Sequence, residues 1–160
     1  KCVDLIVHRG WYENTQFWPP RLYRKFIAPM LKREAEEVHR RGLKFGYIVT
    51  TGIMPILSDI VDCGVDLLLG VDPVQDHVDL KAVKEKLEGR VCIWGGVNSA
   101  VTLRSSCEVI GKAVREAVEK LAPGGGFILG AVDAVFKDTP PRGLKVFIDA
   151  WRKIRSYPYR

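Results

Sequence analysis

The chain has 160 residues, of which 47% are hydrophobic and 28% charged, a composition typical of a globular domain with one sizeable core. No apolar run approaches the ~20 residues that a membrane helix needs, and no basic segment followed by an apolar one opens the chain as in a signal peptide. The net charge is +6, but the basic residues form no one-sided stripe with interleaved aromatics, so neither a membrane nor a nucleic acid is expected as a partner.

The first two predicted units are each a strand followed by a helix. An apolar strand is predicted over Val3–His8, and a long aromatic loop leads from it to a helix over Arg21–Arg41. Gly42 follows that helix at the position where a C′ glycine is common. The second strand is predicted over Lys44–Val49 and the second helix over Met54–Cys63.

Three more units follow with the same order and with similar spacing. Their strands are apolar on both faces, as buried parallel strands are, so they read as continuous hydrophobic runs. The strands and the helices after them are predicted over Val65–Gly70 and Leu80–Leu87, Arg90–Trp94 and Thr102–Leu121, and Gly126–Leu129 and Arg142–Arg155.

Alternation of apolar strands with helices predicts an α/β fold with a parallel sheet covered by helices. Five units fit an open doubly wound sheet or part of a barrel. A complete (β/α)8 barrel needs about 250 residues, so the five units would form its C-terminal part, with the N-terminal part missing. No linker interrupts the chain, and residues 1–160 are therefore predicted to form a single domain.

In a barrel, the loops that follow the strands carry the functional groups on one face. His8 and Arg9 end the first strand, where Arg9 could clamp a carboxylate and His8 could move protons near neutral pH. A structural His and a surface Arg are the equally favoured alternative. The next loop, Trp11–Trp18, contains Tyr12 and is predicted to wall a pocket for a flat ligand, or else to pack on its own helix.

Two acidic residues follow later strands. Asp72 sits in the loop after the third strand, with Gln75 beside it, and could act as a general acid or base or orient a substrate N–H group. A turn that begins with Asp before Pro is the alternative. Asp133 and Lys137 follow the last strand, where they could serve a substrate or form a loop salt bridge.

Polar side chains also follow the second and fourth strands. Thr50 precedes a helix N-terminus, where it could help to bind an anion, although capping of the helix is the commoner role for Thr. Asn98 lies in the loop GGVNS, where it could bind a substrate oxygen or cap the next helix. The four cysteines are scattered without a CxxC pair or a neighbouring His, which argues against zinc and disulfides and favours a reducing, cytoplasmic location.

Four long segments resemble the C-terminal half of the uroporphyrinogen decarboxylase superfamily. They are PMLKREAEEVHRR, GLKFGYIVTTGIMPILSDIVDCGVDLLLGVDP, RVCIWGGVNSAVTL and GGFILGAVDAVFKDTPPRGLKVFIDAWRKI. The resemblance runs over nearly the whole chain and implies strands four to eight of a (β/α)8 barrel. It also implies decarboxylation or corrinoid-dependent methyl transfer, and the segment HRRGLKFGY resembles the methyltransferase branch.

The chain departs from the motifs of both branches. Zinc-dependent members carry His-x-Cys after the fifth strand and a further Cys after the eighth, and the corresponding positions here are Ile48, Thr50 and Asp133. These side chains do not supply the donors of a zinc site, so no metal and no other cofactor is expected unless loop gaps displace the alignment. The His and the acidic residue of true decarboxylases are also not found at the corresponding positions.

The resemblance implies an enzyme domain that carries out decarboxylation or methyl transfer on a small anionic or tetrapyrrole-like substrate. Asp72 and Asp133 are the predicted catalytic residues, and the predicted substrate-binding residues are His8, Arg9, Tyr12, Thr50, Gln75, Asn98 and Lys137. A corrinoid protein is the partner that methyl transfer would require. The alternative is a non-catalytic barrel that binds a metabolite or a corrinoid protein after losing the zinc and decarboxylase residues.

Overall fold

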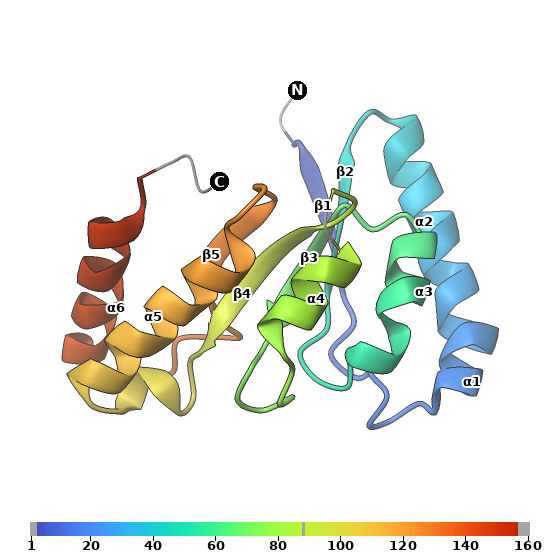
Figure 1. Ribbon diagram of the computed structural model, residues 1–160. Coiled ribbons are helices and arrows are strands. Elements are labelled where there is room, and N and C mark those ends of the chain that lie inside the picture. Colours follow the sequence, from blue (N-terminus) through green and yellow to red (C-terminus); the bar gives the residue numbers. More distant parts are fainter. Residues whose placement is uncertain (1–2, 88, 157–160) are drawn as a thin grey trace.

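The computed structural model describes residues 3–87 and 89–156, and it contains one parallel sheet whose five strands lie side by side in sequence order (Figure 1). The strands are β1 (Leu5–Arg9), β2 (Lys44–Ile48), β3 (Leu67–Val71), β4 (Cys92–Asn98) and β5 (Phe127–Val132). Sequential order without strand reversal is the arrangement found in a barrel, whereas a doubly wound sheet reverses its order. Of the two arrangements that the sequence allowed, the structure shows the one typical of a barrel segment.

Helices connect each strand to the next, and the last helix follows β5; in Figure 1, α4 and α5 lie in front of the sheet, with α2 and α3 to the right and α6 to the left. They are α1 (Pro20–Leu22), α2 (Ala28–Arg40), α3 (Leu57–Asp62), α4 (Leu80–Leu87), α5 (Cys107–Leu121) and α6 (Pro141–Ile154), with a π-helix η1 (Tyr23–Ile27) and short 3₁₀ turns η2 (Met54–Ile56) and η3 (Thr102–Arg104). None of the described helices is long and apolar enough to cross a membrane.

Three predicted helices differ from the observed ones in detail. The helix predicted over Arg21–Arg41 contains the π-helical turn η1, which ends two residues before Pro29. Proline has no N–H and its ring crowds the carbonyl four residues earlier, so the preceding turn widens. The helix predicted from Thr102 begins instead as η3, and α5 starts afresh at Cys107, where Ser106 Oγ accepts a hydrogen bond from Val109 N. The helix predicted over Met54–Cys63 opens with the 3₁₀ turn η2.

The fourth and fifth strands are longer at their carboxyl ends than predicted. The segment GGVNS was expected to be a loop, but β4 continues to Asn98, which pairs with Val132 of β5. Pairing with β5 supplies the backbone hydrogen bonds that keep this segment in the sheet, although Gly95 and Gly96 have positive φ angles of 146° and 92°. The end of β5 and the end of β4 therefore lie next to each other.

Two rows of side chains define the two faces of the sheet. In one row, His8, Tyr47, Leu68, Ile93 and Phe127 are successive register partners, and this row faces the helices. Tyr47 and Leu68 are fully buried, and with the helices they form the core. The next residue of each strand belongs to the opposite row, which consists of Arg9, Ile48, Leu69, Trp94 and Ile128. We call the face that carries this second row the open face, because its side chains include exposed hydrophobics such as Trp94 and Ile128.

Candidate functional site

A cavity of about 320 Å³ lies on the open face, at the carboxyl ends of the strands. Arg9, Trp11, Thr50, Trp94 and Asp133 are among its lining residues, and they come from β1, β2, β4 and β5 or from the loops that follow these strands. The structure thus brings together three of the residues predicted from the sequence, namely Arg9, Thr50 and Asp133. The position agrees with the face on which barrels carry their functional groups.

One wall of the cavity combines a cation with an aromatic ring. The Arg9 guanidinium lies 5.4 Å from the centroid of the Trp11 ring, within the range of a cation–π contact. The Trp11 Nε1 atom is buried and has no hydrogen-bond partner among the described residues. A buried N–H group without an acceptor is costly, so Trp11 is held in place by packing and by its contact with Arg9 rather than by a hydrogen bond. The exposed Arg9 guanidinium is the group of this wall that could bind an anionic oxygen.

Trp94 forms another part of the cavity and rests directly on β5. A Cβ atom added to Gly130 would lie 2.4 Å from Trp94 Nε1, which is closer than real atoms approach. The absence of a side chain at residue 130 therefore allows the indole to lie against the backbone of β5. About a third of Trp94 stays exposed, so its ring presents a flat apolar surface on the open face.

Asp133 follows β5 with an unusual backbone conformation. Its φ angle is +65°, a left-handed conformation that Asp and Asn adopt more readily than most residues. The preceding residue is fixed, because the buried Ser99 Oγ donates a hydrogen bond of 2.5 Å to the Val132 carbonyl. The turn places the exposed residue Asp133 in the lining of the cavity, where it could accept or donate a proton.

Ile48, Thr50 and Asp133, which the resemblance puts at the family's zinc-ligand positions, all line this cavity, but their side chains do not fit zinc. Ile48 has no donor atom, and Thr50 and Asp133 alone do not make up the three protein ligands that catalytic zinc sites use. Among the described residues, no group of three or more His, Cys, Asp or Glu side chains could hold a metal ion. Cys2 lies outside the described residues, while Cys63, Cys92 and Cys107 have free thiols.

Asp72 and Asn98 form a buried network beside the cavity and do not line it. Asp72 is fully buried, and its Oδ1 accepts hydrogen bonds from Val74 N (2.8 Å) and Gln75 N (3.1 Å). Its Oδ2 accepts one from Asn98 Nδ2 at 2.7 Å, and Asn98 Oδ1 in turn accepts from Val101 N at 2.6 Å. The pair therefore ties the loop after β3 to the loop after β4.

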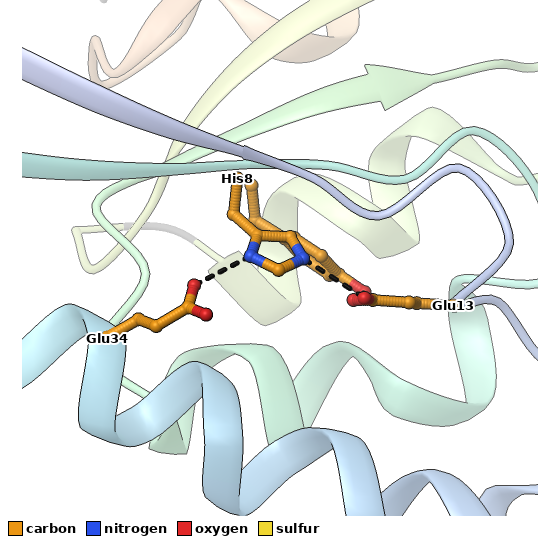
Figure 2. Close-up of polar contacts among 4 residues, drawn as sticks. His8, Glu13 and Glu34 are labelled. Atoms are coloured by element: carbon orange, nitrogen blue, oxygen red, sulfur yellow. Dashed lines mark hydrogen bonds and ion pairs between the residues drawn. The ribbon is translucent and has the colours of Figure 1, made fainter.

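The other predicted site residues lie at separate places. Tyr12 is 72% exposed and lines a neighbouring hollow with Arg9, where its ring stands edge-on to Phe17. Gln75 and Lys137 are exposed on loops and do not line the cavity. His8 lies on the helix-facing row, between Glu13 and Glu34 (Figure 2). Neighbouring residues of a strand point to opposite faces, so His8 and Arg9 cannot serve the same cavity together.

Sequence reasoning did not identify Trp94, Glu13 or Asp76 as contributors to this region. Asp76 accepts hydrogen bonds from Gly52 N (2.5 Å) and Ile53 N (3.2 Å). Burial, the largest influence, raises the pKa of Asp76 although these two hydrogen bonds oppose the change. The sequence suggested that backbone N–H groups near Thr50 could bind an anion. Two of them, those of Gly52 and Ile53, already donate to the Asp76 carboxylate. For Trp94, the sequence signal that was missed is the alternation of side chains along β4, which puts every second residue on the open face.

The chain belongs to the uroporphyrinogen decarboxylase family, whose model matches residues 11–154. The fold is that of a partial (β/α)8 barrel, and its candidate site lies at the carboxyl ends of the strands. No curated protein matches the chain by sequence.

Two solved structures share the fold. A methyltransferase from Methanosarcina mazei superposes with a TM-score of 0.77 at 24% identity, over 96% of this chain and 43% of its own. A B12-independent methionine synthase from Shewanella sp. W3-18-1, solved in complex with selenomethionine, gives a TM-score of 0.67 at 11% identity, over 94% of this chain and 47% of its own. The chain spans less than half the length of both proteins, in agreement with a partial barrel.

Proposed function

We propose that the open-face cavity binds the anionic group of a small or tetrapyrrole-like substrate and that the full-length protein transforms this substrate by decarboxylation or methyl transfer. The observation that carries this proposal is the convergence of Arg9, Trp11 and Asp133 on one cavity at the carboxyl ends of the strands. Membership of the family supports the reaction class, and the exposed Arg9 guanidinium supports the negative charge of the substrate.

The roles of the residues follow from their chemistry and position. Arg9 would hold a carboxylate of the substrate, and Trp94 would offer its flat surface to the apolar part. In a decarboxylation, the carbon–carbon bond to the carboxylate breaks, CO2 leaves, and the electron pair left on carbon takes a proton. Asp133 is the group in the cavity that could deliver that proton, while Thr50 could donate a hydrogen bond to the substrate.

Asp72 and Asn98 enter this proposal as supporting residues. Their hydrogen bonds fix the loops after β3 and β4, and Asp72 has no exposed surface through which a substrate could reach it. Tyr12, Gln75 and Lys137 are exposed on loops outside the cavity, where they could contact only a larger, tetrapyrrole-like substrate that extends beyond it.

Binding without turnover is the second candidate, and the residues at the zinc-ligand positions favour it. Ile48 and Thr50 line the cavity where zinc-dependent members carry metal ligands, so the methyl transfer of that branch lacks its metal donors here. A chain of this kind could still bind a metabolite or dock against a corrinoid protein.

The test uses the full-length protein with two substrates under anaerobic conditions, uroporphyrinogen for CO2 release and a methylated corrinoid with a thiol for methyl transfer. We expect Arg9→Gln and Asp133→Asn to lower kcat/KM for the accepted substrate by at least about tenfold, the usual loss for a substrate clamp or a general acid. The control variants Arg33→Gln and Asp62→Asn alter exposed side chains on α2 and α3 and should leave turnover unchanged.

Equal activity in all four variants would refute the site assignment. The second candidate, binding without turnover, would be established if the protein binds either substrate without converting it and if, of the four variants, only Arg9→Gln weakens that binding. Metal analysis of the purified protein before and after chelation complements this assay, since stoichiometric zinc would show that the ligands lie elsewhere in the full-length protein.

A further inference from the structure

His8 makes two charged contacts on the helix-facing side of β1. Its Nδ1 lies 2.6 Å from Glu34 Oε2 and its Nε2 lies 3.0 Å from Glu13 Oε1, so the imidazole bridges a carboxylate of α2 and a carboxylate of the loop after β1 (Figure 2). A protonated imidazole donates from both nitrogens, and hydrogen bonds between charged groups are stronger than neutral ones. The His8 side chain is only 18% exposed, which limits screening by solvent.

Glu13 connects the His8 bridge to the part of the candidate cavity that Trp11 lines. It lies two residues after Trp11, and its second oxygen accepts a hydrogen bond from Tyr47 Oη at 3.1 Å. Glu13 N donates to the Gly10 carbonyl and Gly10 N donates to Ile48 O, so residues 10–13 form one tight turn on β2. The later part of the loop is held separately, because Thr15 Oγ1 donates to the Gly52 carbonyl.

We propose that His8 is a positioning residue of the candidate site, which bridges Glu34 and Glu13 and thereby fixes the turn that holds Trp11 beside Arg9. This inference rests on the proposed function only for the role of the cavity. It assigns a purpose to a histidine that points away from the cavity and whose two partners come from different elements. Without the bridge, the turn would keep its backbone hydrogen bonds but lose the charged contact that ties it to α2.

The bridge depends on pH. Burial alone would lower the pKa of His8, but the hydrogen bonds and negative charges of Glu13 and Glu34 outweigh it, and the pKa lies above its ordinary value. The bridge is therefore complete below that raised pKa and weakens as the pH rises through it. The other groups on this side are Tyr47 of β2, whose ring centroid lies 5.7 Å from that of His8, and Tyr23 of η1, and burial raises the pKa of both phenols so that they stay neutral. Arg33 and Glu34 of α2 both line a hollow between α2 and the strands β1 and β2.

The experiment follows Trp11 in the full-length protein by fluorine NMR after incorporation of fluorotryptophan, with the signal assigned through Trp11→Phe. Between about pH 5 and 9, we expect the Trp11 signal to move with the same midpoint as the His8 imidazole, above the ordinary value for histidine. His8→Gln should abolish this transition and speed amide exchange in residues 10–13 by about tenfold, the effect of one lost charged hydrogen bond.

Two further variants make the result specific. Glu13→Gln keeps the shape of the side chain and removes its charge, so it should move the Trp11 transition to lower pH even if His8→Gln proves too unstable to study. His39→Gln is the matched control, because His39 Nε2 also lies 2.6 Å from a carboxylate, that of Asp66, but does not touch the loop. This control should leave the Trp11 transition unchanged.

The proposal would be overturned if the Trp11 signal stayed unchanged while His8 titrates, or if His39→Gln altered the Trp11 transition as much as His8→Gln does. Failure of the proposed function gives a different result. In that case, Trp11 still follows His8, but neither the wild type nor any variant binds the tested anionic substrates.

Discussion

Asp72 illustrates how the surroundings of a residue decide its role. A carboxylate at the carboxyl end of a barrel strand is a reasonable candidate for catalysis from its position in the sequence. In the structure it accepts hydrogen bonds from two backbone N–H groups and from Asn98, and it is completely buried. Asp133 has the opposite surroundings, since it is exposed and lines the cavity. The two carboxylates that look alike in the sequence therefore differ in what they can reach.

Replacement of Asp72 by Ala should lower the free energy of unfolding by about 2–3 kcal/mol, because buried donors lose their acceptor. Urea unfolding of the full-length protein measures the change. Asp62→Ala, on the exposed end of α3, should change stability by less than about 0.5 kcal/mol. If the Asp72→Ala variant is as stable as the wild type but has lost turnover, Asp72 acts in catalysis and does not merely support the loops.

At the scale of the elements, close contacts fix how α6 packs. Gly143 lies in the first turn of α6 and is buried, and a Cβ atom there would lie 2.0 Å from the carbonyl oxygen of Leu103 in η3. The helix and the 3₁₀ turn that follows β4 therefore touch through their backbones. Because η3 follows the loop that Asn98 caps, this contact couples the position of α6 to the end of β4.

Two glycine substitutions in helices should have opposite effects on stability. Gly143→Ala should reduce the free energy of unfolding by about 1–3 kcal/mol through the steric clash with η3. Gly111 of α5 meets only the flexible end of Arg115 at 3.4 Å, so Gly111→Ala should raise stability by about 0.5–1 kcal/mol through higher helix propensity. Thermal or urea unfolding compares the two, and a stabilised Gly143→Ala variant would show that α6 does not lie against η3 in this way.

At the scale of the whole molecule, residues 3–87 and 89–156 leave the sheet open on one face and at both edges. Within the described residues, β1 pairs only with β2 and β5 pairs only with β4. Val7, Trp94 and Ile128 are exposed hydrophobic residues of the strands. Unpaired strand edges and a large apolar surface favour association with further polypeptide. The two solved structures that share the fold are about twice as long as this chain or longer, so each contains further polypeptide beyond the part that matches.

A polypeptide limited to these 160 residues should therefore self-associate at micromolar concentration, which sedimentation velocity would detect. Ile128→Lys should reduce the association, because it places a charge on the open face. Val109→Lys is the matched control, since Val109 is similarly exposed but belongs to α5 on the other side of the sheet, and it should have no effect. A monomeric wild-type chain would show that the open face is not a contact surface.

The sequence by itself determined the units of this protein and their order. Mainly apolar strands such as the one predicted over Lys44–Val49, and the helical spacing between them, indicated five strand–helix units, and the structure contains them. The family was also visible in local segments, and the match over residues 11–154 confirms it. These features depend on local periodicity and on residue type, which one chain displays directly.

Only the tertiary structure decided which residues share a site. Strand register places Arg9 in the cavity and His8 behind the sheet, and a shift of one residue would exchange them. Pairing between β4 and β5 extended both strands, and the turn after β5 carried Asp133 to the cavity. Buried hydrogen bonds made Asp72 a partner of Asn98. Register and long-range hydrogen bonds join residues far apart in the chain, so local sequence patterns do not specify them.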